Sequence, residues 1–139
     1  MDRCAELSTR GWSAIAPARI KVGARGSLRI TINNHDDTAL SGLAFIDALP
    51  PGLRITRPAR ASNTCGGTLI RRARPDILGL LNGTVQAGGQ HPGQSTRCVI
   101  TVGVRATAPG SFKDTTGRVM AANALAARPA TARVTVRRT

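Results

Sequence analysis

Three stretches of the chain alternate between apolar and polar residues. They are residues 27–34 (SLRITINN), 97–107 (RCVITVGVRAT) and 130–138 (ATARVTVRR). Successive side chains of a β-strand point to opposite faces, so this period of two predicts strands with one buried face. In the middle stretch the buried face is expected to carry Cys98, Ile100, Val102 and Val104.

Less regular apolar stretches predict further strands at residues 41–49, 52–56 and 76–85, and an extended segment at 111–120. Residues 77–81 (ILGLL) also fit a short helix. Turn-forming residues fill 33–38 and 87–95, and residues 57–76 follow no clear pattern. About seven short strands separated by turns predict an all-β protein folded as an antiparallel β-sandwich.

A length of 139 residues suits one domain. The polar start of the chain, residues 1–11, is expected to be a flexible arm, and residues 12–139 a single domain. The 15 glycines and 8 prolines interrupt the chain too often for a long helix. With two Phe, one Trp and no Tyr, the core has to be built mainly from Ala, Val, Ile and Leu.

The formal net charge of +13 predicts attraction to polyanions. All basic residues except Lys21 and Lys113 are arginines. Such a bias also follows from GC-rich coding, so a solvated surface without a partner is the alternative. The candidates for contacting nucleic acid or an acidic polysaccharide are Arg71, Arg72, Arg74, Arg133, Arg137 and Arg138. The scarcity of aromatic residues argues against a nucleic-acid-binding domain.

No apolar run reaches the length of a membrane-spanning helix, and no membrane insertion is expected. Residues 1–17 lack the continuous apolar segment of a secretory signal peptide. Export as part of a longer chain and residence in the cytoplasm therefore both stay open at this point.

Catalytic and metal-binding patterns are weak. Both histidines, His35 and His91, lie in turn sequences, and no spacing supports a set of Ser95, His91 and Asp76. The stretch NNHDD lacks the order of oxygen ligands that a calcium loop requires. We expect no enzyme activity, no metal, no cofactor and no small-molecule substrate.

The three cysteines, Cys4, Cys65 and Cys98, allow three pairings. Cys98 lies on the inward face of its strand, and the Gly-Gly pair after Cys65 can bend the chain toward it. Two buried free thiols are the alternative.

The stretch AFIDALPPGLRI, residues 44–55, forms a sharp corner between two predicted strands. Pro50 and Pro51 fix two φ angles, and Gly52 is expected to permit the reversal. Asp47 is expected to accept hydrogen bonds from the amides of the turn.

These motifs, in their order, resemble a bacterial conserved-repeat domain of unknown function, the DUF-eleven type. The resemblance runs from Trp12 to Val136 and includes the corner, the piece NTCGGTLI, the strand CVITV with the turn APGS, and the closing ATARVTV. The strong positive charge departs from the usual composition of that family.

The resemblance implies an immunoglobulin-like sandwich, exported and often repeated in tandem on surface or adhesin-like proteins, without enzymatic activity. Cys65 and Cys98 match the two family cysteines, which implies a disulfide between them. The matching corner residues are Asp47, Leu49, Pro50, Gly52 and Leu53. The partners implied are neighbouring repeat domains or components of the cell surface, and the location implied is extracellular.

Overall fold

The computed structural model describes residues 9–34, 38–72, 76–87, 96–117, 119–122, 124–127 and 129–138. These residues form strands and turns, with no helix among them. The strands are β1 (Thr9–Ala16), β2 (Arg19–Lys21), β3 (Arg25–Asn34), β4 (Leu40–Ala48), β5 (Leu53–Ile55), β6 (Ser62–Asn63), β7 (Thr68–Arg72), β8 (Ile77–Val85), β9 (Thr96–Ala106), β10 (Gly110–Thr115), β11 (Val119–Ala121), β12 (Ala124–Ala127) and β13 (Thr131–Arg137).

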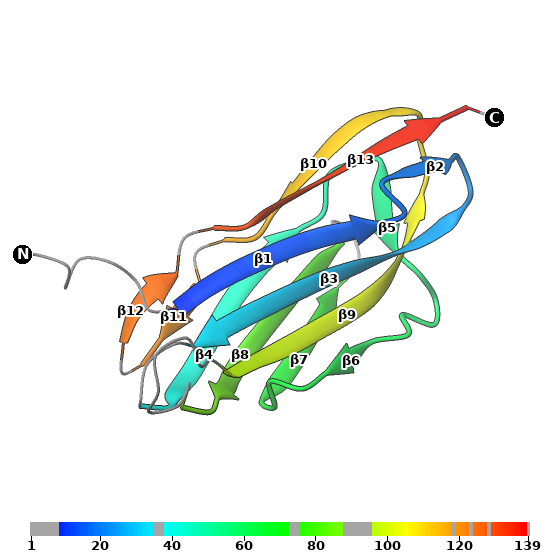
Figure 1. Cartoon of the computed structure of the whole chain (residues 1–139). Helices are drawn as coiled ribbons and strands as arrows, with labels where there is room; N and C mark the ends of the chain where they lie inside the picture. Colours follow the sequence, from blue (N-terminus) through cyan, green and yellow to red (C-terminus); the bar gives the residue numbers. More distant parts are fainter. Residues whose placement is uncertain are drawn as a thin grey trace, which may run out of the picture.

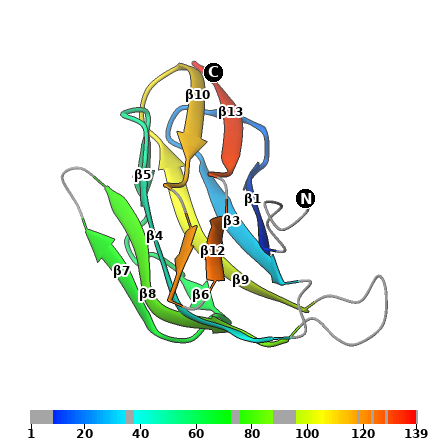
Figure 2. The ribbon, with the colours of Figure 1, turned by 90° about the vertical axis from the view of Figure 1, so that its left-hand side faces the viewer.

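Two sheets face each other across the core (Figures 1 and 2). One has the order β1-β3-β9-β5, with β6 also on β9, and the other has the order β12-β11-β4-β8-β7. A third, smaller sheet, β10-β13-β2, runs along one long side, where β10 contacts β4 and β13 contacts β1. All strand pairs are antiparallel except β13 with β2. The predicted all-β sandwich is therefore confirmed.

The core follows from the alternation seen in the sequence. Leu28, Ile30 and Ile32 of β3 are at most 1% exposed, and the four predicted inward residues of β9 are at most 2% exposed. From the opposite sheet, β4 and β8 add Leu43, Phe45, Leu78 and Leu80. Each strand thus buries one face against the other sheet, which the hydrophobic effect favours by roughly 25 cal/mol per Å² of apolar surface.

Several elements differ from the sequence-based expectation. Residues 77–81 belong to strand β8, so the helical alternative is wrong. The segment 57–76, which has no clear pattern, contains β6 and β7, because both pair with a neighbouring strand. Strand β1 begins at Thr9, inside the segment expected to be an arm, and residues 1–8 of that segment lie outside the described residues.

The start of β1 and the end of β13 lie at opposite ends of the sandwich (Figure 1). Thr9 of β1 lies opposite Asn34 of β3, which lies opposite Thr96, the first residue of β9. At the other end of β9, Ala106 accepts a hydrogen bond from Gly23, next to the end of β13. The 11 residues of β9 place these two ends about 33 Å apart.

Candidate functional site

A disulfide joins Cys65 to Cys98, the pair that the resemblance implied, with the Cα atoms 4.9 Å apart. Both residues are 2% exposed. The backbone of Cys65 is fixed from both sides: its N–H donates to Asn63 Oδ1, and its carbonyl accepts from Thr84 N–H of β8. The covalent bond thus ties β9 of one sheet to a turn held on β8 of the other sheet.

The two glycines after Cys65 have different reasons to be glycine. Both have positive φ angles, 69° for Gly66 and 68° for Gly67. A Cβ on Gly66 would meet no atom within 4 Å, whereas a Cβ on Gly67 would lie 2.2 Å from the carbonyl oxygen of Leu81. Gly66 is therefore constrained by its backbone alone, and Gly67 also by space.

The pair gives a matched prediction. Gly66→Ala is expected to lower the free energy of unfolding by about 1–2 kcal/mol, the cost of a left-handed backbone for an L-residue. Gly67→Ala is expected to cost about 3 kcal/mol, because the backbone of β8 has to move as well. Urea unfolding of both variants checks this, and equal losses would contradict the steric argument.

The corner that precedes β5 is closed by a hydrogen bond from Leu53 N–H to Pro50 O, 3.0 Å long. Leu49 also donates its N–H to the Asp76 carbonyl. Gly52 is not among the glycines with positive φ, so the predicted reason for it, a left-handed reversal, is wrong. The position that a side chain would take at Gly52 faces the ring of Phe112. A Cβ atom built there would lie 2.1 Å from Phe112 Cζ. Gly52 is required because the ring occupies that space.

The prediction for Asp47 is also wrong. Its side chain is 0% exposed, and neither carboxyl oxygen receives a hydrogen bond from the described turn amides. Strand β4 points Asp47 inward, toward Asp114 of β10, which is also 0% exposed. The role expected of Asp47 belongs to Asp76, whose Oδ2 accepts the Ile55 N–H at 2.6 Å and whose Oδ1 lies 3.4 Å from Arg54 Nη2.

The two buried carboxyls share one environment. Burial raises the pKa of Asp114 to about 9, helped by a hydrogen bond to Asp47 and by its negative charge. Burial also raises the pKa of Asp47, although the hydrogen bond from Asp114 acts in the opposite direction. At neutral pH Asp114 is therefore a neutral acid buried beside Asp47. Ala132, directly opposite Asp114 on β13, has a side chain small enough to leave room for this pair.

A shared proton between two aspartates is also a catalytic arrangement in some enzymes. Here both side chains are 0% exposed, so a substrate cannot reach them. Within the described part of the chain, no three metal-ligating side chains come together either. The pair is therefore assigned to the core and not to an active site.

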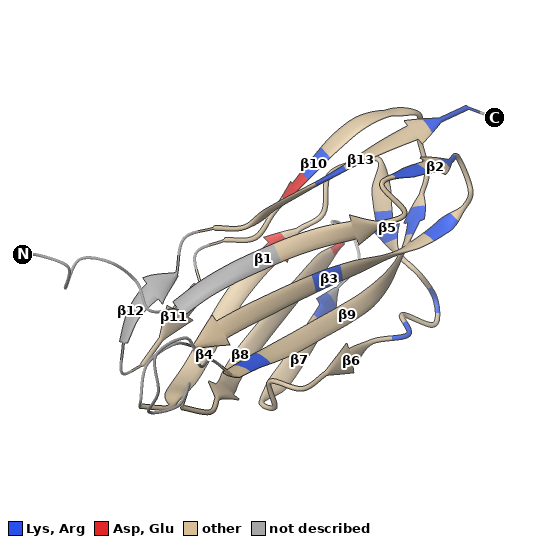
Figure 3. Ribbon diagram, in the orientation of Figure 1, with Lys and Arg blue, Asp and Glu red and all other residues tan. Residues whose placement is uncertain are grey.

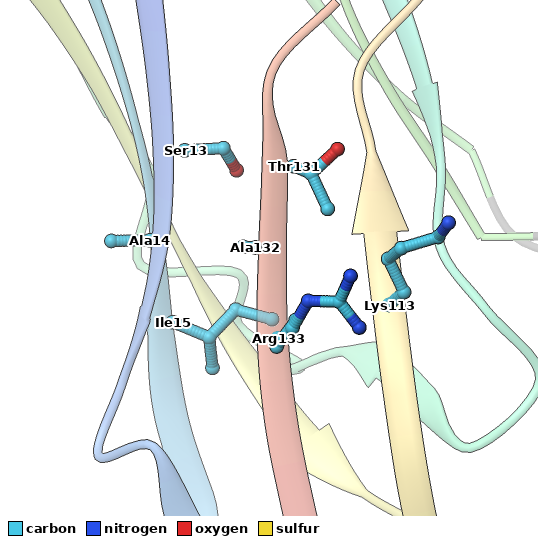
Figure 4. A pocket seen from close by; sticks show the side chains of 7 residues that line it. All are labelled: Ser13, Ala14, Ile15, Lys113, Thr131, Ala132 and Arg133. Carbon is cyan, nitrogen blue, oxygen red and sulfur yellow. The ribbon is translucent and has the colours of Figure 1, made fainter.

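A groove of about 450 Å³ lies between the outer edge of β1 and the strands β13 and β10 (Figure 4). Ser13 and Ile15 project into the groove from β1. Lys113 of β10 and Arg133 of β13 lie on its other side. Lys113 and Arg133 are directly opposed across β10 and β13. The groove thus offers the positive charges of Lys113 and Arg133, while Ser13 Oγ is buried, and the residues that line it supply no base for a nucleophile.

The arginines proposed from the sequence for polyanion binding do not form one cluster (Figure 3). Arg71 and Arg72 lie on β7, at one edge of the larger sheet. Arg133 and Arg137 lie on the outward face of β13, and Arg138 follows it. Arg74 lies outside the described residues. The sequence-based set is therefore divided between two sheets.

The structure shows a charge asymmetry that the sequence did not. The described acidic residues are Asp47, Asp76 and Asp114, and none is more than 9% exposed. The described basic side chains, in contrast, lie on exposed positions of the strands and turns. Lys and Arg gather visibly at the end of the sandwich that holds β2, β5 and the C-terminus (Figure 3). The surface formed by the described residues thus carries mainly positive charge, with one ion pair, between Arg54 and Asp76.

Facing β-sheets, a disulfide across them and no exposed catalytic set in the described residues define an immunoglobulin-like β-sandwich module. The sequence places it in a family: the chain belongs to the family described as "Domain of unknown function (DUF7933)", which it matches over residues 13–136. The DUF-eleven type suggested by the motifs is not confirmed by this match. No curated protein matches the sequence. None of the described residues forms a helix that is long and apolar enough to cross a membrane.

Similar solved structures share the fold at low sequence identity. A cohesin module from a family 33 glycoside hydrolase of Clostridium perfringens has a TM-score of 0.63 and 9% identity, and covers 96% of this chain and 100% of its own. The N-terminal domain of a Streptococcus gordonii adhesin has a TM-score of 0.64 and 12% identity, over 94% of this chain and 33% of its own. The major pilin subunit of Bacillus cereus has a TM-score of 0.59 and 11% identity, over 94% of this chain and 40% of its own.

Proposed function

We propose that this chain is a non-enzymatic structural or adhesive module, one repeat unit of a bacterial surface or secreted protein. The observation that carries the proposal is that β1 begins at one end of the sandwich and β13 ends at the other. The start of β1 and the end of β13 lie about 33 Å apart along the long axis. Modules built this way can follow one another in a line, each continuing from the last.

Two further observations support this proposal. The disulfide between Cys65 and Cys98 suits an oxidising compartment outside the cytoplasm. The similar structures include an adhesin domain and a pilin subunit, proteins that act through binding or assembly. The partners are then neighbouring repeat domains or components of the cell surface.

The location can be tested on the source bacterium with antibodies raised against the folded domain. Intact cells are expected to be labelled as strongly as permeabilised cells. Cells are also lysed in an alkylating reagent, and mass spectrometry then shows which cysteines carry the alkyl group. Cys4 is expected to be alkylated, and Cys65 and Cys98 are not. Labelling only after permeabilisation, with Cys65 and Cys98 both alkylated, would contradict the proposal.

The sequence-based alternative, contact with an acidic polymer, is favoured by one specific observation. All described acidic residues are buried, and among the described residues the only ion pair of an exposed arginine joins Arg54 to Asp76. The residues first named for this role lie on separate sheets, however. A binding surface has to be sought among other arginines.

A further inference from the structure

We infer that the outer face of β3, β9 and β5, at the end near the C-terminus, binds an anionic polysaccharide whose successive sugars carry carboxylates. The strand register carries this inference. Arg25 of β3 lies directly opposite Arg105 of β9, and Arg105 lies directly opposite Arg54 of β5. Residues opposed in this way point to the same face of a sheet, so the three side chains form one row, the arginine row.

The arginine row lies on the solvent side of the sheet. Its members are all exposed, while their neighbours Leu53, Val104 and Ala106 are at most 3% exposed on the inner side. Like charges that face each other across strands destabilise a sheet. Folding alone therefore does not favour three arginines in these positions, whereas a partner that neutralises them would stabilise the row.

The row is not neutralised by the rest of the described chain. Arg54 has one acidic neighbour, Asp76, at 3.4 Å, and Asp76 also accepts a backbone hydrogen bond. Within the described residues, neither Arg25 nor Arg105 has an ion pair. Neighbouring strands are about 4.8 Å apart, so the row spans roughly 10 Å. An extended chain with repeated charges can contact all of it, whereas a single small anion cannot.

The positive surface continues around the edge of β5. After Ile55, the chain stays beside β9, because Thr56 donates its N–H to Gly103 O and Gly103 donates to Ala59 O. This segment and β7 line an open pocket of about 320 Å³. Its lining combines Arg57 and Arg71 with one acidic residue, Asp76, and with Ile55, Thr56, Pro58 and Ala59. One of the arginines named from the sequence, Arg71, thus belongs to this surface.

The chemistry favours an acidic sugar over a nucleic acid. A guanidinium group forms two parallel hydrogen bonds to a carboxylate, and apolar walls pack against the C–H face of a sugar ring. Single-stranded nucleic acid is held largely by stacking on aromatic rings. Phe45 is buried, Phe112 packs against Gly52, and Trp12 of β1 pairs with Thr31, six residues along β3 from Arg25.

Binding of polygalacturonate oligomers tests the inference, with fully methyl-esterified oligomers and double-stranded DNA as comparison ligands. The double variant Arg25→Ser/Arg105→Ser is expected to bind polygalacturonate at least about tenfold more weakly at about 0.1 M salt. The control variant Arg29→Ser/Arg97→Ser removes the same charge from other exposed positions of β3 and β9. It is expected to lose less than about twofold, the scale of an isolated exposed charge.

The stability of the variants separates binding from folding. Thermal unfolding of the Arg25→Ser/Arg105→Ser variant is expected to be unchanged or slightly improved, since two opposed positive charges are removed. The inference is overturned if both double variants lose affinity equally, if the esterified oligomers bind as well as the acid form, or if DNA binds more tightly than polygalacturonate. Failure of the wild-type domain to bind polygalacturonate overturns it too. None of these results bears on where the protein is located, so the module proposal is tested separately.

Discussion

Asp114→Asn is expected to remove most of the decline in stability that the wild-type domain shows as the pH rises from about 4 to about 9. The reason is the proton that the folded state holds between Asp47 and Asp114. Burial raises the pKa of Asp114 to about 9, while in the unfolded chain an aspartate has a pKa of about 3.9. Asparagine has nearly the same shape as a neutral aspartic acid and donates a hydrogen bond to Asp47 without needing a proton.

The sign follows from proton binding in the two states. Below about pH 4 both states carry the proton, and the stabilising contribution of the pair is complete. Between about pH 4 and the folded-state pKa of about 9, only the folded state binds it. The free energy of unfolding then falls by about 1.4 kcal/mol for each pH unit and each such proton. The nearest basic side chains on β10 and β13, Lys113 and Arg133, are exposed and cannot compensate the buried charge.

Urea unfolding of wild type and Asp114→Asn between pH 5 and pH 9 measures this effect. The variant is expected to show a flatter pH profile and a higher unfolding midpoint at pH 8. Asp47→Asn is the matched control for the same site from the other strand, and it too is expected to flatten the profile. Asp114→Ala is expected to be less stable than Asp114→Asn, because it leaves a cavity and an unpaired carboxyl. A free energy of unfolding that rises toward pH 9 in the wild type would contradict a proton held in the buried Asp47–Asp114 pair.

Loss of the disulfide is expected to be the second large effect. Cys65 and Cys98 are separated by 33 residues, and a loop of that size contributes about 4 kcal/mol in the chain-entropy account. This is a large share of the 5–15 kcal/mol that stabilises an ordinary domain. The double variant Cys65→Ala/Cys98→Ala is therefore expected to melt roughly 10–20 °C lower than the oxidised wild type.

Reduction of the wild type gives an independent measurement of the same loss. Dithiothreitol is expected to lower the melting temperature of the wild type to near that of the double alanine variant and to leave the variant unchanged. Cys4→Ser is the control, and its melting temperature is expected to equal that of the wild type. An equally stable reduced protein would show that the two buried sulfurs act only as packing groups.

The main strands could be predicted because their side chains have one clear preference per face. In β3, β9 and β13 the apolar residues alternate with Arg and Thr, and each such strand is present in the structure. Strand β7 was not predicted, because its residues, TLIRR, do not alternate and owe their conformation to pairing with β8. The alternation of apolar and polar residues shows which side chains are buried. Strand pairing, in contrast, depends on contacts between residues that are distant in the sequence.

The functional features divide in the same way. The disulfide pairing came from a motif, but the contact between Asp47 and Asp114 joins residues 67 positions apart without any shared motif. One signal was available: Asp114 follows Phe112 at the inward phase of its strand, just as Asp47 follows Phe45. The arginine row was missed because opposition of Arg25, Arg105 and Arg54 depends on the register of three strands. Register is set by the whole sheet and is not readable from any one segment.

The opposite placement of the two chain ends has a mechanical consequence. In a line of such modules, a pulling force enters at the start of β1 and leaves at the end of β13, so it acts along the strands. The hydrogen bonds of β1 with β3 and of β13 with β10 then resist it together, in shear, instead of breaking one at a time. If the sandwich unfolds under force, the segment between Cys65 and Cys98 cannot be extended, because the disulfide joins its ends. The unfolded chain is then shorter by about 110 Å, the extended length of 33 residues. In such a line, the covalent bond that stabilises the resting domain would also limit how far an overloaded module can lengthen.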